Sequence, residues 1–171
     1  MTIDQINRLV LTVPDFPKKG ISFKDITPIL ENSEAFLSLA KLMAERIHKN
    51  TDKLIAIESR GFILGAAVAQ HCGCGLVLVR KPGKLPRETV RETYDLEYGT
   101  DSLEMHKNAL KPGDRVTIID DVLATGGTAA AVEKLCLRLG AQVLGSVILM
   151  EIEALNGRAK LQNPLVSLIA I

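Results

Sequence analysis

Two adjacent carboxylates and the small residues after them form the segment of this 171-residue chain with the clearest chemical potential. Asp120 and Asp121 follow an apolar, β-branched run at residues 116–119, which predicts a buried strand. An apolar pattern that starts near Ala129 and stops at Gly140 predicts a helix. Between the carboxylates and this helix lies a loop of small and hydroxyl-bearing residues: Ala124, Thr125, Gly126, Gly127 and Thr128.

This order of residues suits a ligand with a phosphate beside a pair of hydroxyls. The first amides of a helix lack partners and carry partial positive charge. Glycines let the backbone curl around an anion, and threonine hydroxyls add donors. Asp120 and Asp121 would repel a phosphate, but they can accept hydrogen bonds from a vicinal diol. We therefore predict a ribose 5-phosphate site in this segment.

Two common phosphate-binding signatures do not occur in the sequence. Without G-x-x-x-x-G-K-[ST] the chain is not a P-loop NTPase, and without G-x-G-x-x-G it lacks the dinucleotide fingerprint. An ordinary turn would explain Gly126 and Gly127 taken alone. It is a poor explanation of the whole segment, because the strand, the carboxylate pair, the glycine turn and the helix start must all coincide.

Residues 115–132 resemble the phosphoribosyl pyrophosphate (PRPP) signature of the type I phosphoribosyltransferase family. The resemblance implies that Asp120 and Asp121 bind the ribose hydroxyls and that residues 124–128 cradle the 5-phosphate. It also implies an α/β fold with a mainly parallel twisted central sheet flanked by helices. A small N-terminal hood at about residues 1–32 and a flexible catalytic loop at about residues 81–106 would complete a single domain over residues 1–171.

Composition places the chain among ordinary globular proteins. Apolar residues make up 47% and charged residues 24%, and the net charge is +1, so nothing favours nucleic acid or a membrane surface as partner. No apolar run approaches the roughly 18 residues of a membrane span, and the N-terminus does not resemble a signal peptide. Cys72, Cys74 and Cys136 are interpreted as reduced, partly buried thiols. We expect a cytoplasmic protein.

Strands and helices alternate through the middle of the chain. Ser33 is expected to cap a helix with Phe36, Leu39 and Met43 on one face, and residues 61–70 form a second helical pattern. Residues 103–110 are ambiguous between strand and helix. Besides residues 116–119, strands are expected at Lys53–Ile57, Gly75–Val79, Gln142–Glu151 and residues 165–169. This alternation predicts an α/β domain with a mainly parallel sheet.

Ligands of such sheets lie beyond the carboxyl ends of the strands. Three segments should therefore converge there, namely residues 58–61, residues 80–81 and residues 120–128. The backbone at Glu58, Ser59, Arg60 and Gly61 can hold a second anion, although a polar turn explains it equally well. Beside the PRPP signature, it is similar to the family's pyrophosphate loop.

The basic run at residues 80–84 supplies cations to the same place. Arg80, Lys81 and Lys84 are assigned to pyrophosphate by the resemblance, although a solvated charge run is the commoner meaning of such residues. In many family members an equivalent arginine reaches the neighbouring subunit's site. The resemblance thus implies a homodimer with Arg80 at its interface.

Residues 80–104 resemble the flexible loop of the adenine phosphoribosyltransferases within the family, with Glu97-Tyr98-Gly99 as the specific part. Residues 81–101 are polar, which indicates a mobile excursion. The resemblance implies that Glu97 is catalytic and approaches N7 of adenine. By composition alone, Glu97 is an exposed loop carboxylate like most glutamates.

The N-terminal run at residues 14–30 resembles the hood of the same enzymes. The resemblance implies that Ser22 and Lys24 present backbone groups to adenine and that Phe23 stacks on the ring. Ile152 matches a position that packs on the base. Family members often carry arginine in place of Lys24. A lysine of the kind that hypoxanthine–guanine enzymes use is absent from residues 145–150.

The resemblance implies the reaction of adenine with PRPP to give AMP and pyrophosphate, with Mg²⁺ held mainly by PRPP and pyrophosphate. No protein ligand of the metal is assigned. Two other functions stay open. One is a phosphoribosyltransferase for another base, such as xanthine. The other is a non-catalytic PRPP sensor, which the missing DNA-binding extension argues against.

Overall fold

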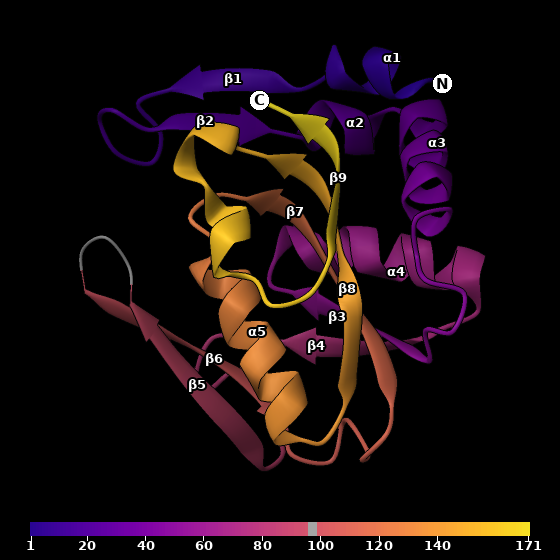
Figure 1. The fold of residues 1–171 in the computed structure, drawn as a ribbon. Helices are drawn as coiled ribbons and strands as arrows, with labels where there is room; N and C mark the ends of the chain where they lie inside the picture. Colours follow the sequence, from indigo (N-terminus) through magenta and orange to yellow (C-terminus); the bar gives the residue numbers. More distant parts are fainter. Residues whose placement is uncertain (96–98) are drawn as a thin grey trace. The chain divides into compact units, whose positions relative to one another are not determined.

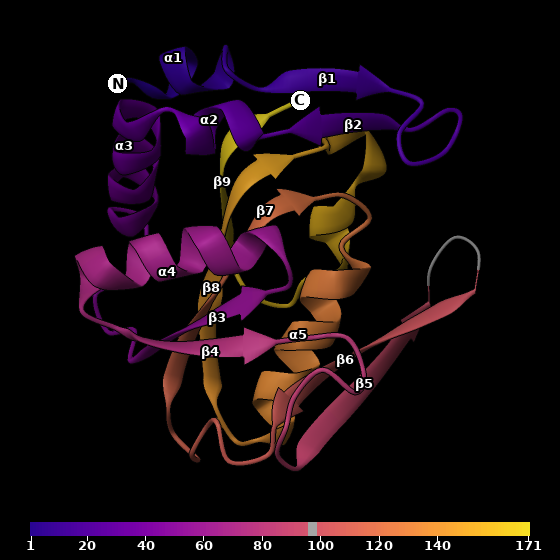
Figure 2. The ribbon, with the colours of Figure 1, turned by 180° about the vertical axis from the view of Figure 1, so that it is seen from behind.

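The computed structural model describes residues 1–95 and 99–171 and divides them into two compact units. The first unit runs from Met1 to Leu42 and the second from Met43 to Ile171. Figure 1 shows both units, and Figure 2 shows them from behind. Each unit is described by itself below. The division into one domain with a hood at residues 1–32 stays a prediction.

The first unit consists of short elements. Helix α1 (Ile3–Asn7) begins with a capping box, in which Thr2 and Gln5 exchange hydrogen bonds between side chain and backbone. Strands β1 (Leu11–Pro14) and β2 (Ser22–Asp25) pair antiparallel, and α2 (Thr27–Glu31) follows with a proline in its first turn. The elements are short because prolines and glycines interrupt the segment.

Helix α3 (Ser33–Ala44) begins one residue earlier than predicted, because Ser33 is its first residue and not its cap. The Asn32 side chain accepts a hydrogen bond from the backbone amide of Ala35, with a distance of 3.0 Å. The prediction was wrong by one position because Asn and Ser are nearly equal as caps. Leu39 and Met43 are fully buried, as the helical spacing predicts, whereas Phe36 is only half-buried.

A five-stranded sheet forms the centre of the second unit, and all its neighbouring strands are parallel. The mainly parallel α/β fold predicted from the sequence is confirmed. The strands run in the spatial order β4, β3, β7, β8, β9. Their bounds are β3 Lys53–Ile57, β4 Gly75–Val79, β7 Arg115–Leu123, β8 Gln142–Glu151 and β9 Leu165–Ala170. Strand β7 is longer than predicted, because it continues through the two carboxylates.

Two helices cover opposite faces of this sheet, as the two views show (Figures 1 and 2). Helix α4 (Arg60–Cys72) connects β3 to β4, and α5 (Gly127–Arg138) connects β7 to β8. Two 3₁₀ turns, η1 (Glu153–Leu155) and η2 (Gly157–Lys160), lie between β8 and β9. None of the helices in the described part of the chain has the length and apolarity that crossing a bilayer requires.

The strand order reverses between β3 and β7. From β3 the chain moves outward to β4, and it then returns to place β7 on the other side of β3. The carboxyl ends of β3 and β7 therefore flank a topological switch point, which is where parallel α/β sheets bind ligands. Figure 1 shows the starts of α4 and α5 at this same edge of the sheet.

The polar segment before β7 forms an antiparallel hairpin of β5 (Thr89–Asp95) and β6 (Thr100–His106). The ambiguity at residues 103–110 is resolved in favour of a strand that ends at His106. Leu103 and Met105 join the core of the sheet and α5. The sequence of this segment is rich in polar residues because alternate side chains of each strand face solvent.

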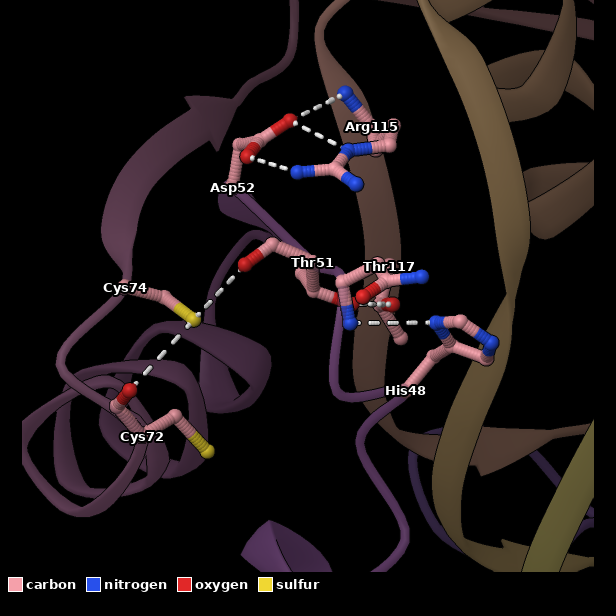
Figure 3. A network of polar contacts seen from close by, with 8 residues as sticks. His48, Thr51, Asp52, Cys72, Cys74, Arg115 and Thr117 are labelled. Carbon is pink, nitrogen blue, oxygen red and sulfur yellow. Dashed lines mark hydrogen bonds and ion pairs between the residues drawn. The ribbon is translucent and has the colours of Figure 1, made fainter.

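A polar network joins β3 and β7 at the opposite edge of the sheet (Figure 3). Asp52 accepts hydrogen bonds from the backbone amide, Nε and Nη2 of Arg115, at 2.8–3.0 Å. These bonds lower the pKa of Asp52 to about 2. The hydroxyls of Thr51 and Thr117 lie 2.7 Å apart, and the Cys74 thiol donates to the Thr51 carbonyl. The network fixes the amino ends of the two strands that carry the candidate site.

Candidate active site at the carboxyl ends of β3 and β7

The loop after β3 brings the start of α4 against the first carboxylate. Gly61 is the second residue of α4, and a Cβ atom there would lie 2.7 Å from Oδ1 of Asp120. Only glycine therefore allows this approach without a shift. Ser59 precedes the helix and forms no side-chain cap hydrogen bond, and its peptide bond with Glu58 is cis. Backbone amides at this helix start can receive an acceptor.

The two carboxylates of β7 lie in different surroundings. Asp121 is buried, and its Oδ2 lies 2.7 Å from Nη2 of Arg60 in an ion pair. Asp120 is half-buried, and its Oδ1 accepts a hydrogen bond from the Asp121 amide at 2.9 Å. Burial, and then the charge of Asp121, hold the pKa of Asp120 well above its ordinary value. Asp121 thus has a charged protein partner, whereas Asp120 is the less stabilised anion.

The loop at residues 124–128 leads directly into α5. The helix begins at Gly127, two residues before the predicted start, and Gly126 precedes it with a φ of +78°. No side chain caps this helix start in the part of the chain that the structure describes. Its first amides and the positive end of its dipole therefore remain for an anion. The assignment of a 5-phosphate to these residues stays a prediction.

Gly157 of η2 packs against this loop, and sequence reasoning missed it. A Cβ on Gly126 would lie 2.1 Å from the Gly157 carbonyl oxygen, and a Cβ on Gly157 would lie 2.1 Å from the Ala124 carbonyl oxygen. The loop is thus held by a backbone contact that excludes side chains on both glycines. The residues around Gly157 carry no local signal for this contact, because it joins segments about 30 residues apart.

The cations after β4 share one carboxylate. Glu58 Oε2 lies 2.9 Å from Arg80 Nε, and Glu58 Oε1 lies 3.0 Å from Lys84 Nζ. Burial favours a higher pKa for Glu58, but hydrogen bonds from Lys84, the Lys81 amide and Arg80 outweigh it and lower the pKa. The guanidinium of Arg80 also lies over the Phe62 ring, 5.7 Å from its centre. Glu58 therefore positions the cations through its side chain.

Lys81 has a different partner. Its Nζ lies 3.0 Å from Oδ2 of Asp101 on β6, and the side chain of Lys81 is 54% exposed. The hydrogen bond to Asp101 raises the pKa of Lys81, which keeps it charged at neutral pH. The structure thus brings Arg60, Arg80, Lys81 and Lys84 into ion pairs with protein carboxylates.

The residues predicted to bind adenine lie in both units. Ser22, Phe23 and Lys24 form β2, where the Phe23 ring meets Phe16 edge to face at 5.0 Å. Lys24 donates to the Thr12 hydroxyl at 3.0 Å. In the second unit, the Ile152 amide donates to the Leu123 carbonyl at 2.9 Å, which places Ile152 just beyond β7 and β8.

Glu97, the predicted catalytic residue, lies outside the described residues. The structure describes the chain up to Asp95, the last residue of β5, and again from Gly99, just before β6. Within the described ranges, no group of three or more His, Cys, Asp or Glu side chains is placed to hold a metal ion.

The family model of the phosphoribosyl transferase domain matches residues 25–168. The chain belongs to the phosphoribosyltransferase family. The match includes the loops after β3, β4 and β7, and also Gly157. The sheet and its flanking helices are the type I phosphoribosyltransferase fold, as predicted.

Relatives within the phosphoribosyltransferase family are similar over nearly the whole chain. An adenine phosphoribosyltransferase of Syntrophotalea carbinolica is 51% identical over 160 residues, which cover 93% of this chain and 94% of that protein. The crystal structure of adenine phosphoribosyltransferase from Thermoanaerobacter pseudethanolicus has a TM-score of 0.97 and 48% identity, and covers 99% of this chain and 100% of that one. The Saccharomyces cerevisiae enzyme, in complex with an iminoaltritol bisphosphate and adenine, has a TM-score of 0.90 and 39% identity, with 97% of each chain covered.

Proposed function

We propose that the protein transfers the 5-phosphoribosyl group of PRPP to adenine, giving AMP and pyrophosphate, as a pentosyltransferase of purine salvage. The observation that carries the proposal is the pairing of two carboxylates on β7 with the uncapped start of α5 at the switch point of the sheet. The choice of adenine is supported by the names of relatives at about half identity.

The 5-phosphate is assigned to Ala124, Thr125, Gly126, Gly127 and Thr128. Helix-start amides and the α5 dipole favour an anion there. Asp120 and Asp121 are assigned to the ribose hydroxyls, from which they would accept hydrogen bonds. Because Asp121 is already paired with Arg60, Asp120 gains more from such donors, which stabilise its charged form.

Pyrophosphate is assigned to the amides at residues 58–61 and to Arg60, Arg80, Lys81 and Lys84. Each of these cations already has a carboxylate partner: Asp121, Glu58 or Asp101. Pyrophosphate carries more negative charge than one carboxylate and can therefore compete for them. If pyrophosphate replaces these carboxylates as the partner of the cations, the cations are already in position before the substrate binds, and less free energy is needed to arrange them.

The donor set fits a Mg²⁺ ion bound largely through the substrate. Mg²⁺ commonly takes one or two carboxylates and completes its shell with phosphate oxygens and water. Asp120 is a half-buried carboxylate that is assigned above to the ribose hydroxyls, and no protein ligand of the ion is assigned. When bound, the ion would supply charge stabilisation for the departing pyrophosphate.

In the proposed reaction, the bond between the anomeric carbon and pyrophosphate breaks, and its electron pair leaves with pyrophosphate. Adenine N9 forms the new bond to the oxocarbenium-like anomeric carbon, and the N9 proton is released and ends in the solvent with the products. Glu97 is assigned as the residue that hydrogen-bonds N7 and assists this proton loss. Ser22, Phe23, Lys24 and Ile152 are assigned to adenine. Closure of residues 81–101 would exclude water.

A homodimer with Arg80 at the interface and a cytoplasmic location complete the proposal. The homodimer is supported by the resemblance to the family, and the cytoplasmic location by the interpretation of the three cysteines as reduced thiols. The function is tested by following pyrophosphate release from PRPP and Mg²⁺ with and without adenine. Adenine-dependent release is expected. Tight PRPP binding without release in the presence of any base would favour a sensor and overturn the enzyme proposal.

A further inference from the structure

Tyr94 connects the β5–β6 hairpin to the proposed 5-phosphate loop, although the proposed chemistry gives it no role. The hydroxyl of Thr128 donates to the Tyr94 hydroxyl, with a distance of 3.3 Å. The Tyr94 ring lies against the start of α5, because a Cβ on Gly127 would be 3.2 Å from Cδ2 of the ring. Figure 1 shows the hairpin running alongside α5.

Tyr94 also has a polar contact within the hairpin. Asp101 is its direct partner across the hairpin, and the Tyr94 hydroxyl interacts with the Asp101 carboxylate. Lys81 holds that carboxylate through the ion pair at 3.0 Å. Burial is the main cause of a raised pKa for Tyr94, so the hydroxyl keeps its hydrogen at neutral pH. Lys81, Asp101, Tyr94 and Thr128 thus form one chain of polar contacts.

The hydrogen bond to Tyr94 involves the side chain of Thr128, which can adopt more than one rotamer. Threonine in a helix divides between two χ1 rotamers, because its hydroxyl can bond a preceding carbonyl. Thr128 is the second residue of α5 and belongs to the proposed phosphate site. A hydroxyl both donates and accepts. When a phosphate takes the Thr128 hydrogen, Tyr94 can turn its own hydrogen from the Asp101 carboxylate to the Thr128 oxygen and keep the contact with Thr128, while Asp101 keeps its ion pair with Lys81.

We propose that Tyr94 is a positioning residue for the 5-phosphate, whose hydroxyl holds Thr128 in the rotamer that donates to the phosphate and ties the β5–β6 hairpin to the filled loop. The inference rests on the proposed function, because it assumes a 5-phosphate at residues 124–128. The gain is pre-organisation, since a side chain that is already ordered loses less freedom on binding.

The test measures the affinities of the Tyr94→Phe variant for AMP, which carries a 5-phosphate, and for magnesium pyrophosphate, which does not. Calorimetry should show an AMP dissociation constant raised about fivefold, the equivalent of one net hydrogen bond. The pyrophosphate constant should stay within about twofold of wild type. Phenylalanine keeps the ring against Gly127, so this variant removes the hydroxyl alone.

Two further variants separate positioning from hairpin stability. Thr93→Val removes a hydroxyl contact of the same hairpin, the 2.9 Å pair of Thr93 and Ser102, on the exposed side away from Tyr94, and should bind AMP like wild type. Thr128→Val should weaken AMP binding. Adding Tyr94→Phe to it should cause no further loss, because residues that act through one another are not additive.

Three results would overturn the inference: unchanged AMP affinity in Tyr94→Phe, equal weakening of AMP and pyrophosphate, or losses that multiply in the double variant. In all three cases the wild-type protein still binds AMP, so the proposed function is not affected. Failure of the wild-type protein to bind either ligand would instead remove the proposed function, and the inference with it.

Discussion

Gly126 and Gly157 touch through their backbones so closely that neither position has room for a side chain. A Cβ on Gly126 would lie 2.1 Å from the carbonyl oxygen of Gly157, far inside any normal contact. Gly126 also has a φ of +78°, which favours glycine in its own right. The contact sets the path of the proposed phosphate loop from a segment after β8, so the loop depends on η2 as well as on β7 and α5.

The first prediction concerns Gly157→Ala. The new methyl group would meet the Ala124 carbonyl oxygen at 2.1 Å, so the loop or η2 must move. A displacement of about 1 Å in a binding site can cost about 100-fold in rate. We expect kcat/KM for PRPP to fall by about this factor, measured from initial rates.

Gly73→Ala is the matched control for this substitution. Gly73 ends α4 with a φ of +65°, and nothing lies within 4 Å of a Cβ built there. It should lose about 1–2 kcal/mol of stability, the cost of a left-handed conformation for a residue with a side chain, and keep its PRPP kinetics. Wild-type kcat/KM in Gly157→Ala would show that the loop does not depend on this contact.

The second prediction is that Asp120→Asn stabilises the fold while it impairs PRPP use. An unfolded aspartate has a pKa near 3.8, and folded Asp120 has a higher one. The folded chain therefore binds the proton more tightly, and stability falls as pH rises from 3.8 through the raised pKa. At neutral pH the variant should have a higher Tm, with kcat/KM for PRPP lower by about 10- to 100-fold.

Asp52→Asn serves as the control, because it should change the Tm in the opposite direction. Its folded pKa is about 2, below the ordinary 3.8, so its charge stabilises the fold above pH 3.8 and this contribution is lost as pH falls through about 2. Asp52→Asn should lower the Tm at neutral pH and leave PRPP kinetics unchanged. A lower Tm for Asp120→Asn would contradict the electrostatic account of the carboxylate pair.

The third prediction concerns the residue next to Gly157. Arg158 donates to buried Glu151 from Nε at 3.0 Å and from Nη2, and to the Leu165 carbonyl from Nη1 at 2.7 Å. These bonds anchor η2 to β8 and β9. Lysine cannot reproduce the planar fork, so Arg158→Lys should cost about 1–3 kcal/mol, measured by urea unfolding.

PRPP affinity should weaken in the same variant, because η2 supports the phosphate loop. Arg87→Lys is the control, since Arg87 is exposed and donates to the Asn108 side chain at 2.8 Å, and its replacement should change neither quantity. If Arg158→Lys lost stability but kept its PRPP affinity, the bonds of Arg158 would not be needed for the phosphate loop.

The fourth prediction is that Glu97→Ala lowers kcat more than it lowers PRPP affinity. A residue that acts on adenine N7 in the transition state contributes to turnover rather than to ground-state binding of PRPP. Steady-state kinetics and PRPP titration give the two quantities. Glu88→Ala, at an exposed glutamate just before β5, should behave like wild type. Equal losses in turnover and affinity would remove the catalytic assignment.

The sequence was sufficient for the parallel sheet, since buried β-branched runs mark β3, β4 and β8 at their observed bounds. The sequence also predicted a strand, the loop at residues 124–128 and a helix in that order, because the signal for each lies in adjacent residues. The contact of Gly157 with the loop and that of Tyr94 with Thr128 were not predictable, because each joins segments that are distant in sequence. The hairpin was missed as regular structure because its exposed face is polar, and Asn32 took the cap expected of Ser33.

Competition among bases for limiting PRPP tests the central claim most directly. The protein would receive Mg²⁺, PRPP and equal amounts of adenine, hypoxanthine, guanine and xanthine, and the nucleotides formed would be identified by mass spectrometry. The account predicts AMP as the main product, formed in step with pyrophosphate. A different nucleotide as the main product would contradict the adenine assignment, and no nucleotide at all would contradict the enzyme itself.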